Sequence, residues 1–280
     1  MRKPAVAGSF YAGSENELRR QIEGCFKHPL GPGALPVVQK AGPRHILGLI
    51  IPHAGYVYSG PVASYGFLHI ASEGKPEVVI ILGPNHRGVG AAVAIGKESN
   101  WQTPLGTVET DSEVGGQIVS AGRWLQWDDL AHSWEHSLEV QLPFLQYIYG
   151  TEFRIVPIVM LRQDLEVSRD LGQAIAAALE NKDGIIIAST DFSHYEPQSV
   201  ASRNDHLALE AILSLSPRQL EKVVIAHDIS MCGVGPVMAM LTACKQLGAD
   251  KARLLRYATS GDITGDYSQV VGYASVEVTT

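Results

Sequence analysis

The chain has 280 residues, of which 45% are hydrophobic and only 18% are charged. Soluble domains usually carry about 25% charged residues, so this composition favours a large buried core. The formal net charge is −7 and the basic residues are scattered, which argues against a nucleic-acid partner. The apolar stretches are far shorter than the roughly 20 residues that cross a bilayer, and the start of the chain has no apolar signal core. The sequence therefore predicts a cytoplasmic protein with no membrane partner.

Apolar runs rich in β-branched residues alternate along the chain with segments of helical period, which is typical of an α/β fold. Predicted strands cover residues 46–51, 78–82, 92–95, 153–159, 184–189, 252–258 and 270–278. Predicted helices cover residues 15–26, 61–71, 112–120, 137–149, 165–181, 200–213 and 234–247. We expect one domain over residues 1–280, built on a central, mainly parallel or mixed sheet flanked by helices.

Three details refine this prediction. The continuous apolar runs at residues 78–82 and 185–188 indicate inner strands that are covered on both faces. The last strand, residues 270–278, mixes polar with apolar residues, which favours an antiparallel strand at an edge of the sheet. Residues 28–44 contain three Gly and four Pro and predict a surface loop.

Chemically active side chains follow three of the predicted strands. His53 comes just after the first strand, His86 just after the second, and Asp191 and His194 follow the strand that ends at Ser189. In open α/β sheets, ligands bind outside the carboxyl ends of the strands. The sequence therefore predicts a shared site at one edge of the sheet.

A second cluster, residues 128–137, contains His132, Glu135 and His136. The position of its glutamate does not match the zinc peptidase motif. Two interpretations stay open: the segment caps the following helix and its histidines are incidental, or Glu135 and His136 face a pocket. A triad of Ser189, Asp191 and His194 is a minor alternative, because the chain has no nucleophile elbow.

The three cysteines, at positions 25, 232 and 244, include no CxxC pair, which argues against a disulfide framework and a structural zinc ribbon. Cys25 and Cys244 lie within apolar helical patterns and are expected in the core. Cys232 precedes a helix in a glycine-rich turn, where we expect the thiol to ionise more readily and to act as a metal ligand or nucleophile.

Six segments together resemble the MEMO1 family, in the same order along the chain. They are Pro4–Tyr11, Pro52–Tyr56, Gly83–His86, Glu135–Ser137, Ser189–His194 and Cys232–Gly233. That family is similar in fold to the catalytic subunit of class III extradiol ring-cleaving dioxygenases, which are non-haem iron(II) enzymes. The resemblance spans nearly the whole chain and implies the same fold here.

The resemblance also implies a site. It suggests one metal ion held by His53, His86 and Cys232, with catalytic roles for the surrounding His136, Asp191 and His194. In the related dioxygenases the ligands are two histidines and a carboxylate, and a further histidine, matched here by His194, acts as acid or base. Cys232 takes the place of the carboxylate, and a thiolate is a softer donor. Iron or copper is the expected ion, with zinc as a third option.

Two functions compete at this stage. The first is a metal-dependent redox enzyme related to the dioxygenases. The second is a non-catalytic binding module that holds a phosphopeptide or another anionic ligand in the same site, as the resemblance to animal members of the family implies. Hydrolysis by zinc-bound water is a weaker third option. A small-molecule or peptide ligand is expected in each case, and a homo-oligomer is left open.

Overall fold

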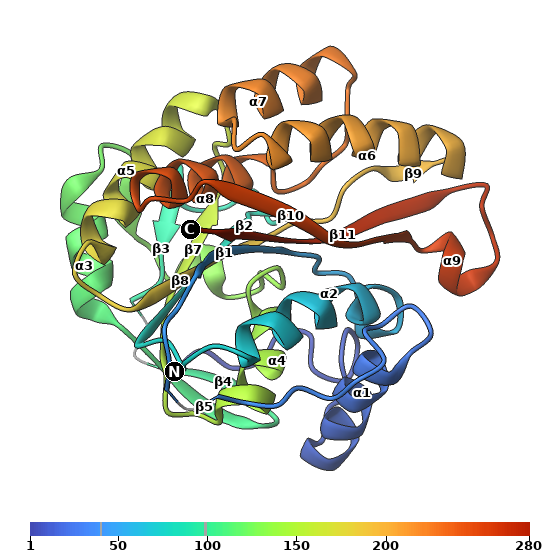
Figure 1. Ribbon diagram of the computed structural model, residues 1–280. Helices are drawn as coiled ribbons and strands as arrows, with labels where there is room; N and C mark the ends of the chain where they lie inside the picture. The colour runs from blue at the N-terminus through green and yellow to red at the C-terminus, as the bar shows by residue number, and fades with distance from the viewer. Residues whose placement is uncertain (40, 98–99) are drawn as a thin grey trace.

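The computed structural model describes residues 1–39, 41–97 and 100–280. Within them, eleven strands join one mixed sheet with helices on both faces (Figure 1). The strands are β1 (Ile46–Ile51), β2 (Val78–Pro84), β3 (Val93–Ile95), β4 (Asn100–Thr103), β5 (Gly106–Thr110), β6 (Leu125–Trp127), β7 (Arg154–Met160), β8 (Gly184–Ser189), β9 (His194–Glu196), β10 (Lys251–Thr259) and β11 (Val270–Thr279). The α-helices are α1 (Glu15–Lys27), α2 (Tyr56–Ala71), α3 (Ser112–Ala121), α4 (Leu142–Tyr149), α5 (Leu165–Leu179), α6 (Gln198–Leu213), α7 (Pro217–Ala226), α8 (Val234–Gln246) and α9 (Gly261–Thr264).

The sheet is parallel at its centre, and antiparallel pairs flank this centre, β1 with β11 on one side and β7 with β3 on the other. Its main order is β10-β11-β1-β8-β2-β7-β3-β6, and β1, β8, β2 and β7 run parallel to one another. The last strand, β11, is antiparallel as predicted, but its predicted edge position is wrong. It lies between β10 and β1, which both pair with it. Its charged residue Glu277 has partners there, because it bonds to Arg253 of β10 and to His69 of α2.

Alternate residues of the central strands face two separate cores. Ile80 and Ile186 belong to the core on the side of α3, α5, α6, α7 and α8. Ile81 and Ile187 belong to the core on the side of α1, α2 and α4. Because both faces are covered, β2 and β8 are apolar without alternation, as predicted from their sequences.

Several boundaries and elements differ from the prediction. Helix α2 begins at Tyr56, and α4 begins at Leu142 after a short 3-10 helix at Glu139–Gln141. Helix α7 was not predicted, although its sequence has a clear apolar face; Leu220 is its one fully buried side chain. The hairpin β4–β5 was also missed. The loop at residues 28–44 contains no helix or strand over its described part, as predicted.

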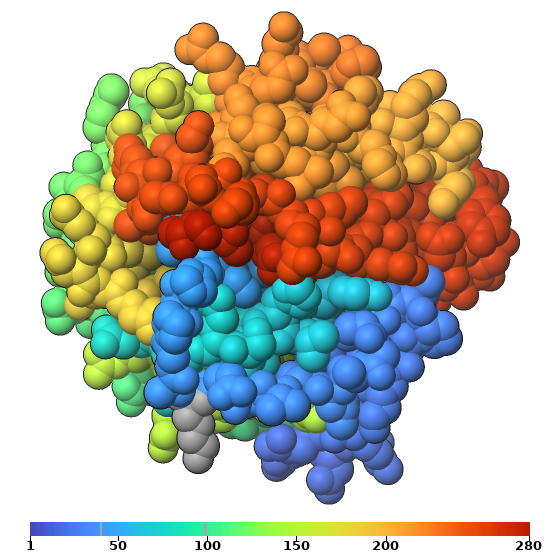
Figure 2. Space-filling model, viewed as in Figure 1, coloured from blue at the N-terminus to red at the C-terminus, as the bar shows by residue number. Residues whose placement is uncertain are grey.

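The edge strand β10 lies at the surface between helices α6 and α7 on one side and helix α2 on the other (Figure 2). None of the helices in the described ranges combines the length and the apolar character needed to cross a membrane.

Helices α5 and α8 pack closely at Gly172. A Cβ atom there would lie 2.5 Å from the carbonyl oxygen of Ala239 in α8. We expect Gly172→Ala to lower the free energy of unfolding by about 1–3 kcal/mol, since backbone atoms cannot move aside cheaply. Gly24→Ala in α1 is the matched control, because no atom lies within 4 Å of its added methyl. It should raise stability by about 0.5–1 kcal/mol. Urea unfolding of both variants checks this, and equal shifts would disprove the close approach.

Candidate metal centre

Three neighbouring strands bring the predicted side chains to one edge of the sheet. β8 lies between β1 and β2, and all three run parallel. His53 follows β1, His86 follows β2 and Asp191 follows β8, each two residues after the end of its strand. Cys232 comes from elsewhere in the chain and directly precedes Gly233, the residue before α8. The predicted convergence of these loops is confirmed.

Two histidines and a cysteine lie close enough to share one ion. Nε2 of His53 is 3.3 Å from Sγ of Cys232. The ligand atoms of His53, His86 and Cys232 all lie within 4.8 Å of one another. Metal–nitrogen and metal–sulfur bonds of about 2.0–2.3 Å in a tetrahedral site put ligand atoms roughly 3.5 Å apart, so the three side chains fit an ion. His53 is buried, Cys232 is half-buried and His86 is exposed, which leaves one side open.

The ring of His53 is held by a serine and a glutamine. The hydroxyl of Ser189 donates to the carbonyl oxygen of Ser137 and accepts from Nε2 of Gln141 at 2.8 Å. Its remaining lone pair lies 2.9 Å from Nδ1 of His53, so Nδ1 carries the proton and Nε2 keeps its lone pair. Burial, together with the nearby His136 and His86, lowers the pKa of His53 well below its usual value. The ring is therefore neutral, which is the state that binds a metal.

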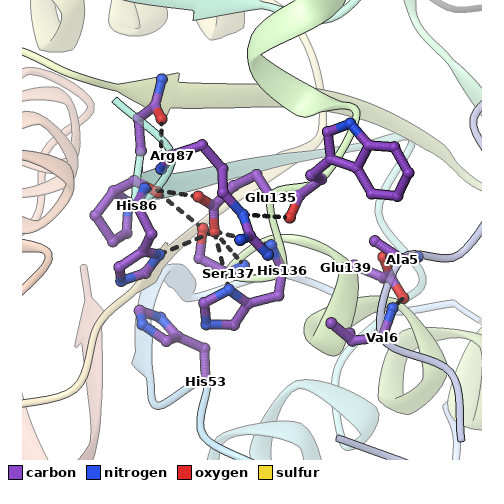
Figure 3. Close-up of polar contacts among 12 residues, drawn as sticks. Ala5, Val6, His53, His86, Arg87, Glu135, His136, Ser137 and Glu139 are labelled. Atoms are coloured by element: carbon purple, nitrogen blue, oxygen red, sulfur yellow. Dashed lines mark hydrogen bonds and ion pairs between the residues drawn. The ribbon is translucent and has the colours of Figure 1, made fainter. Parts of the chain in front are cut away.

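A buried carboxylate orients His86. Glu135 accepts the backbone N–H of His86 at 2.7 Å and its ring Nδ1–H at 2.9 Å (Figure 3). It also accepts the backbone N–H groups of His136 and Ser137, each at 2.8 Å. Burial would raise the pKa of Glu135, but these hydrogen bonds and the neighbouring imidazoles hold it well below its usual value. The carboxylate is thus ionised and leaves Nε2 of His86 free to bind.

His136 stacks beside the two histidines. Its ring centroid is 4.6 Å from that of His86 and 5.4 Å from that of His53, and Phe10 packs against it at 4.7 Å. Burial is the main reason why its pKa falls to about 4. Together with His86 and Glu135 it forms a second group of three potential ligands. The pocket-facing interpretation of this segment is favoured over incidental capping.

Cys232 reaches the site because Gly233 lets α8 approach the end of β8. A Cβ atom at Gly233 would lie 2.6 Å from the carbonyl oxygen of Ser189. The backbone N–H of Asp191 donates to Sγ of Cys232 at 3.2 Å. The expectation that this thiol ionises readily is wrong for the protein alone, since burial and then Asp191 raise its pKa. An ion that binds here would have to displace the thiol proton.

Asp191 and His194 flank the cluster. Asp191 is buried, accepts the backbone N–H of His53 at 2.8 Å, and has a pKa raised to about 6, chiefly by burial. His194, at the start of β9, is half-buried, and its Nδ1–H donates to the carbonyl oxygen of Ser230 at 2.9 Å. Because a carbonyl oxygen only accepts, Nε2 of His194 is unprotonated when the ring is neutral.

One of the sequence candidates, His132, does not join this cluster. His132 is buried and directs Nε2 towards the carbonyl oxygen of Ala94. The minor triad hypothesis is not supported, because the hydroxyl of Ser189 bonds to His53 and Ser137.

Sequence reasoning gave no supporting role to Glu135, Ser189 or Gln141. A polar residue between apolar neighbours, such as Gln141 between Val140 and Leu142, is the sequence feature that could have identified such residues.

Comparisons with known proteins agree with this arrangement of segments. The sequence model of the family described as Memo-like protein matches residues 2–277. A MEMO1 family protein of Ignicoccus hospitalis is 50% identical over 279 residues, which cover 99% of this chain and 98% of the relative. Another, from Methanopyrus kandleri, is 50% identical over 277 residues and covers 98% of each chain.

A solved structure also has a similar fold. It is that of an uncharacterized protein from Escherichia coli K12, which matches with a TM-score of 0.59 at 12% identity, over 83% of this chain and 99% of that one. At this identity the likeness concerns the fold alone. The full-length sequence matches decide the family, and this chain belongs to the Memo-like, or MEMO1, protein family.

Proposed function

We propose that this protein binds one transition-metal ion through His53, His86 and Cys232 and uses it in a redox reaction on a small molecule. The observation that carries the proposal is that a hydrogen bond at Nδ1 orients the ring of each histidine. Each donates Nδ1–H to a buried oxygen, from Ser189 or from Glu135, so that in the neutral ring Nε2 carries the lone pair that could bind an ion.

The donor set favours iron or copper, with zinc as the third option. Imidazole suits all three ions, and a thiolate favours the softer ones. When bound, such an ion would supply electron transfer and open positions for substrate. This set differs from the two histidines and one carboxylate of non-haem iron oxygenases, so ring cleavage is not part of the proposal.

The chain's own groups would orient the substrate and move protons. His194 can accept a proton at Nε2, since its Nδ1–H is bound to Ser230. Asp191 would exchange a proton close to neutral pH, because burial raises its pKa to about 6. His136 and Phe10 pack together next to His86 and would border the substrate.

Elemental analysis of protein purified without oxygen and without added metal tests the proposal. We expect close to one iron or copper ion per chain in the wild type, and loss of that ion in His86→Ala. His227→Ala is the control, because this histidine is exposed and lies outside both ligand groups. Oxygen uptake with catechol-like and other reducing substrates then measures the redox reaction.

The outcomes separate the competing functions. Absence of metal in the wild type, even after reconstitution, would overturn the proposal and favour a metal-free binding module. Stoichiometric zinc without oxygen uptake would support the metal site but overturn the redox reaction. Equal metal content in wild type and His86→Ala would place the ion elsewhere.

A further inference from the structure

The side chain of Arg2 is buried, although it stands next to the start of the chain. It is 6% exposed, and its guanidinium lies 4.3 Å from the ring centroid of Trp101. Its Nε–H donates to the carbonyl oxygen of His132 at 3.1 Å, and Nη2–H donates to that of Glu135 at 2.6 Å. A single guanidinium thus holds the two ends of the turn that spans residues 132–135.

Glu139 is the anionic partner of Arg2, and its carboxylate is fully buried. It also accepts the backbone N–H groups of Ala5 at 2.7 Å and Val6 at 3.0 Å (Figure 3). The hydroxyl of Tyr11 donates to it at 2.6 Å. These bonds fasten the N-terminal segment, residues 2–11, to the segment that begins at Glu139. The segment includes the whole Pro4–Tyr11 motif, of which the proposed function uses Phe10 alone.

The bond from Arg2 to Glu135 connects this segment to the candidate metal centre. The carbonyl of Glu135 is fixed by Arg2, while its carboxylate holds the backbone and ring nitrogens of His86. We propose that Arg2 and Glu139 are positioning residues, which fix Glu135 so that His86 keeps its proton on Nδ1 and its lone pair on Nε2. The effect on metal affinity rests on the proposed function, whereas the effect on His86 does not.

The chemistry of the contacts explains why an arginine stands here. The planar guanidinium donates to the carbonyl oxygens of Lys3, His132 and Glu135 and to the carboxylate of Glu139, and it lies over the ring of Trp101. A lysine could still pair with Glu139. Its single ammonium group, on a flexible side chain, cannot donate to all of these acceptors in a fixed geometry. Arg2→Lys therefore tests orientation with the charge retained.

The experiment follows the ring nitrogens of His86 in protein without metal. Proton–nitrogen correlation spectra of nitrogen-15-labelled histidine distinguish the two neutral ring forms. We expect the Nδ1–H form in the wild type, and a mixed or broadened signal in Arg2→Lys. Co²⁺ affinity, measured by competition with a chelator, should fall by about tenfold or more, as is typical when a partner behind a ligand is lost.

Further variants separate positioning from simple loss of stability. Arg2→Met with Glu139→Gln removes both buried charges, and it should show the same change at His86 even if Arg2→Met alone fails to fold. Arg253→Met is the control, because it removes an arginine–glutamate contact to Glu277 on β11, away from the site. This control should change neither His86 nor Co²⁺ affinity.

An unchanged His86 signal in both Arg2→Lys and the double variant would overturn the positioning role. If the wild type binds no Co²⁺, the proposed function fails, but the histidine spectra still decide this inference.

Discussion

Cys232→Ala is expected to weaken Co²⁺ or Zn²⁺ binding by a factor on the order of 10²–10³. Structural zinc sites with four ligands bind with roughly 10–16 kcal/mol, or about 3 kcal/mol per ligand, and this variant removes one of three protein ligands. Competition with a coloured chelator gives the affinity. The sulfur-to-cobalt charge-transfer absorption should disappear at the same time.

Cys244→Ala provides the matched control for this prediction. Cys244 is a buried cysteine of α8 that contacts the core rather than the site. Its replacement should lower stability modestly but leave metal affinity and the charge-transfer band unchanged. A band that survives in Cys232→Ala and vanishes in Cys244→Ala would refute the assignment of the thiol ligand.

Glu135→Gln is expected to weaken metal binding by about 10–100-fold and to lower the free energy of unfolding by about 1–3 kcal/mol. The carboxylate accepts three backbone N–H groups and the Nδ1–H of His86. An amide NH₂ in the same place would face donors and leave some of them unsatisfied. Chelator competition and urea unfolding measure the two effects separately.

Glu277→Gln controls for the loss of a buried glutamate bonded to a histidine. Glu277 accepts from Nδ1 of His69 at 2.7 Å and from Arg253, far along the chain from the metal-site residues. It should cost stability without changing metal affinity. If both variants bind metal as the wild type does, Glu135 has no role in preparing His86.

The sequence was most informative about the fold where its apolar runs are continuous. β1, β2 and β8 were predicted because strands buried on both faces need such runs. The inner position of β11 was not predictable from its own residues, since the partners of its buried Glu277 lie on β10 and α2. Short strands such as β4 were missed because they contain too few residues to show a clear alternation of polar and apolar side chains.

The site was predictable for a related reason. The chemically active side chains follow strong strand signals, so topology alone brings His53, His86 and Asp191 to one edge. The supporting contacts could not be read in this way. Arg2 and Glu139 are far apart in the chain. No apolar periodicity or residue spacing in the sequence indicates that the guanidinium of Arg2 contacts the turn at residues 132–135.

The inner position of β11 has a consequence for folding during synthesis. β11 is synthesised after both of its neighbours in the sheet and inserts between β10 and β1. Until then, the apolar strand β1 lacks one neighbour, and the nascent chain exposes an edge that other chains could pair with. The loop after β1 carries His53, so the candidate metal centre would be completed only after β11 has paired with β1. A ribosome-bound chain that lacks β11 should therefore depend on chaperones and should not retain metal.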